Sequence, residues 1–356
     1  ALSIGLLWWN EGRSVKQYKS LKEGQGAVVS ASATPIDSSL DGSLVYITGL
    51  AKSKTNLADS EFGIDDRLIK LERDVEMYQW KESEKTETKK NFGGSETKVK
   101  TYSYSKGWDD SLIDSQEFKK SAEHRNPNLM KYKAFTLIAD TVTVGDYTLS
   151  RSLKSKFKTT LFPSLKDLLS ANSIPEEATI REQYLYIGSD DSNPQIGDIK
   201  ITWSFAEDTD VSVVAEQQGK DLAGYQTKVG NKIEILREGI VGIDQIFEDA
   251  QSANSTLTWI LRLVGTILCF IGFFLITSPL SVFADVVPFI GSLVGAGTAL
   301  VSFILSIVIS FLTIAVAWFA YRPILSICLI ISAIAAGYII KLKLPKKAQP
   351  DAGGNG

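Results

Sequence analysis

Long uninterrupted stretches of apolar residues occur only in the last hundred residues of the chain. Residues 257–278 contain one charged side chain, Arg262, and residues 324–340 contain none. A bilayer core of roughly 30 Å is crossed by about 20 helical residues. We therefore predict a polytopic membrane protein with transmembrane helices at 257–278, 293–320 and 324–341.

A shorter apolar segment, residues 1–9, precedes the first charged residues and ends in two tryptophans. At 1.5 Å per residue it reaches only about 13 Å, too little to span a bilayer. Tryptophans followed by charge are typical of a helix that leaves a membrane. We interpret the segment as the remnant of a first transmembrane helix; a buried strand or the end of a signal peptide is the alternative.

Residues 279–292, between two predicted spans, mix apolar residues with Asp285 and Pro288. An interfacial or re-entrant segment fits this mixture better than a full crossing. Asp285 is the acidic residue of the apolar region, and an intramembrane acid is a functional hypothesis by default. Three small residues nearby are Gly291, Gly295 and Gly297. We expect them to form a helix-packing face, within one chain or between protomers.

Four lysines directly after the last apolar stretch favour a cytoplasmic C-terminus. They are Lys341, Lys343, Lys346 and Lys347, and they open a tail, residues 342–356, that is basic and then glycine-rich. With four crossings both termini are cytoplasmic. Residues 10–256 then lie on the other side, which is periplasmic or extracellular in a bacterium and lumenal in a eukaryote.

Residues 10–256 alternate apolar and polar positions in short segments, the period-two pattern of β-strands. Gly, Asp, Ser and Asn separate the segments and favour turns. Helical spacing occurs at 164–171 and at 244–252, and the second helix is expected to continue into the following span. The predicted strands are 26–32, 43–50, 68–81, 98–108, 134–144, 147–150, 183–187, 198–205, 211–217 and 232–236.

The predicted fold class is therefore a polytopic α-helical membrane protein with a large β-rich α+β extracytoplasmic domain. It has four transmembrane helices, of which the first is truncated.

The two longest predicted strands flank a glycine-containing turn at 91–95 and are expected to pair as a hairpin. One face of the first strand is apolar, with Ile69, Leu71, Val75 and Met77. The other face is aromatic, as is one face of the partner strand. These aromatic residues are Tyr78, Trp80, Tyr102 and Tyr104. Cross-strand packing explains them, and a binding face for a lipid headgroup or partner segment is the alternative.

Charge divides the chain at the same place as hydropathy. Residues 1–256 hold 32 basic and 39 acidic groups, whereas the remainder holds six basic and two acidic groups. An acidic domain is a poor partner for nucleic acid. Both cysteines, Cys269 and Cys328, lie in apolar spans, so the domain offers no disulfide or thiolate zinc site. We expect no cofactor and no metal.

Catalytic chemistry has weak support. The single histidine, His124, stands without a recognisable nucleophile or metal-ligand pattern, and a loop hydrogen bond is its expected role. The acidic loop 189–198 could hold a weak calcium ion, although a solvated turn is the simpler interpretation. Asn254 begins a glycosylation sequon so close to a span that we expect it to be unused. We predict that the protein is not an enzyme.

Six short strings, in order along nearly the whole chain, resemble the TMEM43 (LUMA) family of membrane proteins. The strings are N-E-G-R at residue 10, V-E-M-Y-Q-W at 75, H-R-N-P at 124, G-D-I-K at 197, T-K-V-G at 227 and Y-R-P at 321. The family-motif positions are Asn10, Glu11, Gly12, Arg13, Glu76, Tyr78, Gln79, Trp80, His124, Asn126, Pro127, Gly197, Asp198, Tyr321, Arg322 and Pro323.

The resemblance implies a four-pass protein with a large domain between the first two spans and no established catalytic activity. It also implies the endoplasmic reticulum or inner nuclear membrane in animals, self-association, and contacts with lamins and emerin. The short first span, the acidic loop and the Gly/Asn-rich tail depart from this pattern and favour a bacterial homologue.

Together these features predict a non-catalytic membrane-organising scaffold that self-associates through its transmembrane helices. Its expected partners are membrane lipids, further copies of itself and other membrane proteins. A lipid- or partner-binding module that uses the aromatic hairpin face is the second hypothesis. An enzyme or transporter is the third, because the spans lack the paired ionisable groups that a substrate pathway usually needs.

Overall fold

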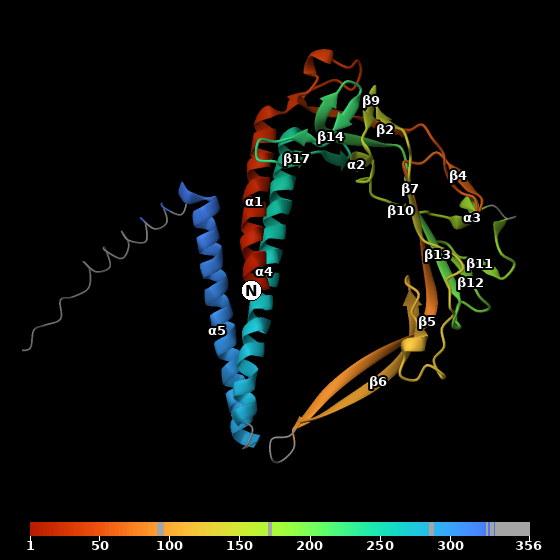
Figure 1. Cartoon of the computed structure of the whole chain (residues 1–356). Coiled ribbons are helices and arrows are strands. Elements are labelled where there is room, and N and C mark those ends of the chain that lie inside the picture. Colours follow the sequence, from red (N-terminus) through yellow and green to blue (C-terminus); the bar gives the residue numbers. More distant parts are fainter. Residues whose placement is uncertain (91–95, 170–172, 285–287, 325–326, 328–330, 332–356) are drawn as a thin grey trace, which may run out of the picture. The chain divides into compact units, whose positions relative to one another are not determined.

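A computed structural model describes residues 1–90, 96–169, 173–284, 288–324, 327 and 331 (Figure 1). The chain divides into a helical unit, residues 1–19 and 252 onward, and a β-rich unit, residues 20–251. The predicted turn 91–95, Asp285 and almost all of the fourth predicted span at 324–341 lie outside the described residues.

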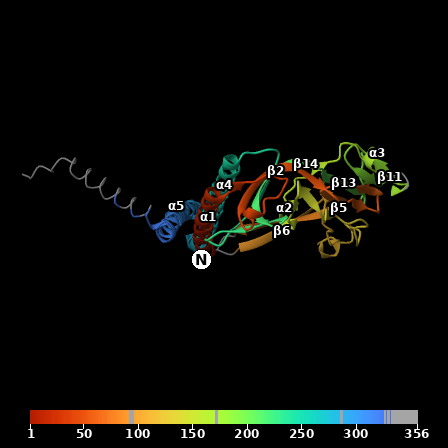
Figure 2. The same cartoon turned by 90° about the horizontal axis from the view of Figure 1, so that it is seen from above.

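Three helices make up the described part of the helical unit: α1 (Leu2–Ala27), α4 (Ile243–Ala284) and α5 (Pro288–Tyr321). Where the three helices run together, α1 lies between α4 and α5 in both views (Figures 1 and 2). Buried residues of α1 recur at spacings of three and four, the pattern of a helix packed on a neighbour. They include Ser3, Leu7, Asn10, Glu11, Ser14 and Val15.

Two stretches among the described helices are long and apolar enough to cross a membrane. They are Ile243–Ser278 and Gly297–Tyr321, with mean hydropathies of 2.3 and 2.7. Only 11% and 17% of their most apolar windows are buried. The core helix of a soluble protein would be mostly buried, so this exposure favours contact with lipid.

The predicted strand at 26–32 is wrong in its first half, because α1 continues through Ala27 and only Val29–Ser30 (β1) is extended. Residues 16–25 are rich in Lys, Gln, Glu and Leu, which are good helix formers. Leu21 packs with Leu44 and Phe247 in a small apolar cluster, which holds this end of the helix in place. The start of α4 at Ile243 confirms the helix expected at 244–252, which continues without a break into the span.

A small closed barrel forms one half of the β-rich unit. Its strand order is β1-β2-β8-β9-β15-β14-β18, and an additional β2–β14 pairing closes the ring. The bounds are β2 Leu44–Ser53, β8 Val142–Val144, β9 Tyr147–Leu149, β14 Thr209–Gln218, β15 Asp221–Ala223 and β18 Ile235–Glu238.

A second sheet has the order β11-β12-β13-β5-β6, with β10 beside β13 and β7 beside β5. Its two longest strands, β5 and β6, form the predicted hairpin, in register from Met77 opposite Asp109 to Lys90 opposite Glu96. The bounds are β5 Lys70–Lys90, β6 Glu96–Asp109, β7 Phe135–Ile138, β10 Thr160–Leu161, β11 Ala178–Ile180, β12 Leu185–Ile187 and β13 Ile199–Ala206.

Short elements complete the unit. Two further strand pairs are β3 Leu57–Asp59 with β4 Ile64–Asp66, and β16 Tyr225–Gln226 with β17 Lys232–Ile233. The short helices are α2 Arg151–Lys154, α3 Leu165–Leu168, and the 3-10 turns Ser38–Leu40 and Ser115–Glu117. The helix predicted at 164–171 is thus one described turn.

Two predicted strands are interrupted. The strand at 134–144 breaks into β7 and β8 at Asp140, where the buried Lys154 amine binds the carbonyls of Ala139 and Asp140 and takes them out of a ladder. The strand at 232–236 breaks at Glu234, whose carbonyl accepts a bond from Lys156. A side chain that claims a backbone carbonyl ends strand pairing locally.

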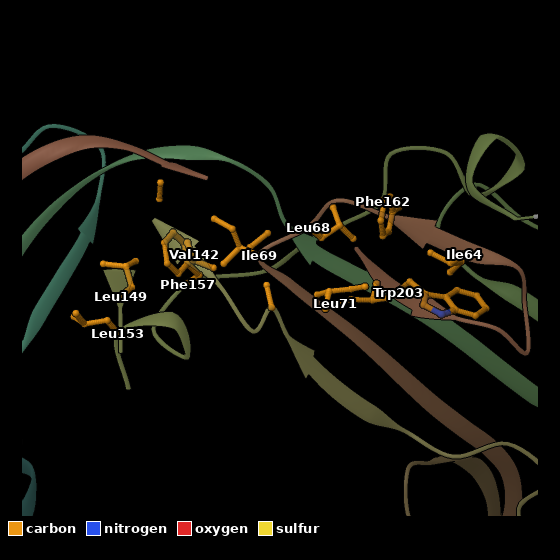
Figure 3. Packing of buried hydrophobic residues seen from close by; sticks show 14 of the residues in the cluster. Ile64, Leu68, Ile69, Leu71, Val142, Leu149, Leu153, Phe157, Phe162 and Trp203 are labelled. Carbon is orange, nitrogen blue, oxygen red and sulfur yellow. The ribbon is translucent and has the colours of Figure 1, made fainter. Parts of the chain in front are cut away.

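One apolar core runs from the barrel into the second sheet (Figure 3). Leu149, Leu153 and Phe157 lie at its barrel end, and Trp203 lies at the other. The predicted buried face of β5 is confirmed, because its apolar side chains are at most 1% exposed. Asp59 is also buried there and binds both the Arg73 guanidinium and the Trp203 indole, which satisfies the charge.

Candidate functional site

The first family string, N-E-G-R, lies in the middle of α1 and faces α4 and α5. The Glu11 side chain is fully buried and accepts two hydrogen bonds from Arg262, at 2.7 Å from Nε and 2.9 Å from Nη2. It also accepts the Trp318 indole N–H at 2.8 Å. One carboxylate therefore joins three helices, and a paired buried charge of this kind constrains how they pack.

Asn10 and Arg13 extend this polar cluster along α4. Asn10 donates to the Thr258 carbonyl at 3.0 Å. Arg13 donates to Asn254 Oδ1 and to Thr258 Oγ1, both at 3.0 Å. Asn254 in turn donates to the Ser14 carbonyl, so this part of the α1–α4 contact is polar.

Small residues bring the helices close. A Cβ at Gly12 would stand 2.8 Å from the ring of Tyr321, and a Cβ at Gly265 would stand 2.6 Å from Leu7. Tyr321 also packs on Trp8, with ring centroids 5.8 Å apart. The first and last strings, N-E-G-R and Y-R-P, therefore meet in one place although they lie more than 300 residues apart.

We did not predict this cluster from the sequence. A lone arginine in an apolar span usually snorkels to the membrane surface, whereas Arg262 is paired and only 14% exposed. The signal was present, since Arg262 is the one charge of its span and Glu11 follows the other apolar segment. Opposite charges on two helices predict an ion pair only once the two helices are known to be neighbours.

The strings V-E-M-Y-Q-W and H-R-N-P meet in the second sheet. Asn126 is buried, accepts the Trp80 backbone N–H at 2.7 Å and donates to the Trp80 carbonyl at 3.0 Å. Gln79 is also buried and bonds the backbone of Ser111 and Ile113. The Asn126 amide thus satisfies the backbone of β5 at Trp80, as a neighbouring strand would, and the Gln79 amide fixes the loop that follows β6.

The string G-D-I-K joins the same region. The Gly197 N–H donates to the Tyr78 carbonyl, and the Tyr78 N–H donates to the Asp198 carbonyl. Gly197 has φ +98°, in the left-handed region, and a Cβ there would touch Pro127. The Asp198 side chain accepts from Tyr186, and burial together with this bond raises the pKa of the Tyr186 phenol.

The aromatic residues of the hairpin share one face, as predicted, and each is half-buried. His124 stacks on Tyr104 with ring centroids 3.7 Å apart and meets the Trp80 ring edge-on at 4.6 Å. Its Nδ1 lies 3.1 Å from the Lys120 carbonyl. The structure therefore places His124 in an aromatic cluster with a loop hydrogen bond.

The string T-K-V-G forms the turn between β16 and β17. Thr227 is buried and donates to the Asn231 carbonyl at 2.7 Å, and its hydroxyl lies 3.0 Å from that of Ser20 in α1. Glu23 accepts the Lys228 backbone N–H. Gly230 has φ +94° and closes the turn.

The other candidate positions are more scattered. Glu76 is exposed, and Arg322 lies over the Trp318 ring at 5.9 Å beside Pro323. Gly291 and Gly295 lie in the backbone of α5, and Gly297 has no neighbour within 4 Å of an added Cβ. In the acidic loop, Asp191 accepts from Arg181 and Tyr184. No group of three potential metal ligands occurs among the described residues.

The fold and the polar cluster define a membrane protein in which a β-rich unit with a small barrel accompanies long apolar helices. The pattern of the family described as Transmembrane protein 43 matches residues 77–323, and the chain belongs to this family.

Curated relatives agree over nearly the whole length. Transmembrane protein 43 of Mus musculus is 32% identical over 97% of this chain and 88% of its own, and that of Homo sapiens is 31% identical over the same shares. The Transmembrane protein 43 homolog of Drosophila melanogaster is 29% identical over 94% of this chain and 89% of its own. No solved structure matches.

Proposed function

We propose that this chain is a non-catalytic membrane scaffold that self-associates through its transmembrane helices and holds its β-rich unit outside the cytoplasm. A periplasmic, extracellular or lumenal position of that unit, four crossings and a bacterial origin are parts of the same proposal. The acidic balance of residues 1–256 and the lysines after residue 340 support this orientation.

The observation that carries the self-association proposal is the contrast between two glycines of α4. Gly265 is covered by Leu7 of α1, whereas an added Cβ at Gly272 would meet no atom of the described residues within 4 Å. Glycines let helix backbones approach closely, and large apolar side chains around an uncovered glycine suit a second helix. Ile271 and Leu275 beside Gly272 are 45% and 64% exposed.

The non-catalytic part rests on how the shared motif side chains are used. Glu11, Asn126 and Asp198 each bind partners that hold helices, strands or loops together. His124 is packed between two aromatic rings. Residues of a catalytic centre would instead converge on a substrate site with their reactive atoms free.

Native mass spectrometry of the full chain in a mild detergent, with chemical crosslinking in vesicles, tests the scaffold proposal. We expect oligomers from the natural sequence and a strong loss of them in Gly272→Leu. Val264→Leu, which enlarges another exposed side chain of α4 without filling a glycine, is the matched control. A clean monomer at all detergent-to-protein ratios would refute self-association.

A second candidate function uses the aromatic face of the hairpin to bind a lipid headgroup or partner segment. It is favoured by the partial exposure of all four residues: Tyr78, Trp80, Tyr102 and Tyr104. Tyr102→Ser in the full chain tests it, because Tyr102 lies beyond the His124 cluster. Unchanged vesicle and partner crosslinking in this variant would exclude the face.

A further inference from the structure

A cavity of about 290 Å³ lies between α4 and α5. Its walls are mainly apolar and aromatic, from Trp259 on α4 and from Phe311, Ile314 and Trp318 on α5. Three polar side chains also line it, Arg262, Thr266 and Ser310, and the Thr266 hydroxyl donates to the Arg262 carbonyl of its own helix. Mostly apolar walls with a few convergent polar groups are the usual make-up of a small-molecule site.

The Ser310 hydroxyl is the first sign of a ligand. Ser310 is 1% exposed, and its oxygen has no hydrogen-bond partner among the described residues. Other buried serines of the same helix are satisfied, since Ser302 pairs with Thr277 and Ser306 donates to the Phe303 carbonyl. A buried hydroxyl left unpaired is unfavourable, so a partner supplied from the cavity would stabilise it.

Arg262 supplies the second polar group. Its Nε and Nη2 atoms bind Glu11, while no hydrogen bond to Nη1 occurs among the described residues. Because Glu11 already neutralises the guanidinium, the cavity calls for a neutral oxygen acceptor rather than an anion. An ester carbonyl has this chemistry.

The cavity lies at the depth where such carbonyls occur. Arg262 is five residues after the start of the apolar stretch at 257–278, and Trp318 is three residues before the end of the second candidate span. Both belong to the same end of the helix pair, where Trp259 and Trp318 form the aromatic rim typical of a membrane interface. The cavity is near the lower limit of ligand-site volumes, roughly 300 Å³. It can therefore hold part of one acyl chain but not a whole lipid molecule.

We propose that this cavity binds the upper part of one acyl chain of a glycerolipid, with the chain packed against the aromatic walls. The ester carbonyl of that chain accepts hydrogen bonds from Arg262 Nη1 and the Ser310 hydroxyl. The second acyl chain remains in the bilayer. This lipid site goes beyond the scaffold role and does not depend on self-association.

Photo-crosslinking of the full chain in phosphatidylcholine nanodiscs tests the site, with a diazirine placed near the ester of one acyl chain. We expect labelling concentrated on the α5 peptide that contains Ile314 and Trp318. Ala315→Phe, which fills the cavity, should abolish this labelling. Ser310→Ala should reduce it about fivefold, the weight of one hydrogen bond.

Val316→Phe is the matched control, because Val316 is 57% exposed, neighbours Ala315 and does not line the cavity. It should leave the labelling unchanged. Equal labelling in Ala315→Phe and Val316→Phe would mean that only the surrounding bilayer is detected and would overturn the proposal. Labelling by a photoreactive sterol that phosphatidylcholine fails to displace would overturn the choice of a glycerolipid.

Discussion

At the scale of single residues, the buried carboxylates of Glu11 and Asp59 are each paired with an arginine and a tryptophan indole. Glu11 accepts three hydrogen bonds from two helices. Glu11 stabilises the helix contact only while it is paired with Arg262. A buried carboxylate that loses its guanidinium keeps its desolvation cost and loses its compensation.

We expect Glu11→Gln to lower the free energy of unfolding of the full chain by about 3–5 kcal/mol, the usual cost of breaking a buried ion pair. Arg262→Met should have a similar effect. The double variant Glu11→Leu with Arg262→Met should lose less than the sum of the single variants, because no charge is left unpaired. Tryptophan fluorescence during unfolding in detergent measures the cycle, and strict additivity would contradict a direct pair.

Tyr186 gives a pH prediction. Burial, followed by the hydrogen bond to the Asp198 carboxylate, raises the pKa of its phenol above the ordinary value of about 10. The neutral phenol therefore stabilises the folded state. This contribution is complete below pH about 10 and is lost as the pH rises through the folded-state pKa.

In an alkaline titration followed at the phenolate absorbance, we expect Tyr186 to ionise only when the protein unfolds. Tyr186→Phe should lower stability at neutral pH and should flatten its fall above pH about 10. The same slope in the natural sequence and the variant would show that Tyr186 is not the group responsible.

At the scale of elements, the long strand β5 shows how loops complete a sheet. Among the described residues, no strand pairs with the outer edge of β5 beyond Met77, where its pairing with β13 ends. The Asn126 side chain makes the two hydrogen bonds to the Trp80 backbone that such a strand would have made. Gln79 holds the neighbouring loop through the Ser111 carbonyl and the Ile113 N–H. The string H-R-N-P therefore stabilises the outer edge of the hairpin through Asn126.

We expect Asn126→Ala to destabilise the β-rich unit by about 2–3 kcal/mol, because it leaves the backbone N–H and carbonyl of Trp80 unpaired. Hydrogen exchange at the Trp80 amide should accelerate strongly. Asn128→Ala, at an exposed position of the same loop, is the control and should change neither quantity. Slow exchange of the Trp80 amide in Asn126→Ala would show that Asn126 does not stabilise this edge of β5.

At the scale of the whole molecule, the arrangement across the membrane is the main prediction. Single cysteines at Ser103 in the β-rich unit and at Ala352 in the tail, each in a background without Cys269 and Cys328, report it. We expect a membrane-impermeant maleimide added from outside to label position 103 in intact cells or sealed vesicles of natural orientation. Position 352 should react only after permeabilisation, and labelling of both from one side would refute the topology.

The sequence predicted the features that depend on local periodicity. The apolar runs predicted the helices that become α4 and α5, and alternation predicted β2, β6, β9, β13 and β14 and the buried face of β5. These patterns are readable because burial of one face repeats at a fixed spacing along a helix or strand. The aromatic face of the hairpin followed from the same alternation, although its packing around His124 did not.

Long-range pairing was decided by the tertiary structure. Nothing in the local sequence of Glu11 names Arg262 and Trp318 as its partners, and nothing near Asn126 names the backbone of Trp80. The β2–β14 pairing that closes the barrel likewise joins segments about 160 residues apart. The sequence by itself determined which faces must be buried, and only the fold decided which buried polar groups meet, because a hydrogen bond depends on the position of both partners.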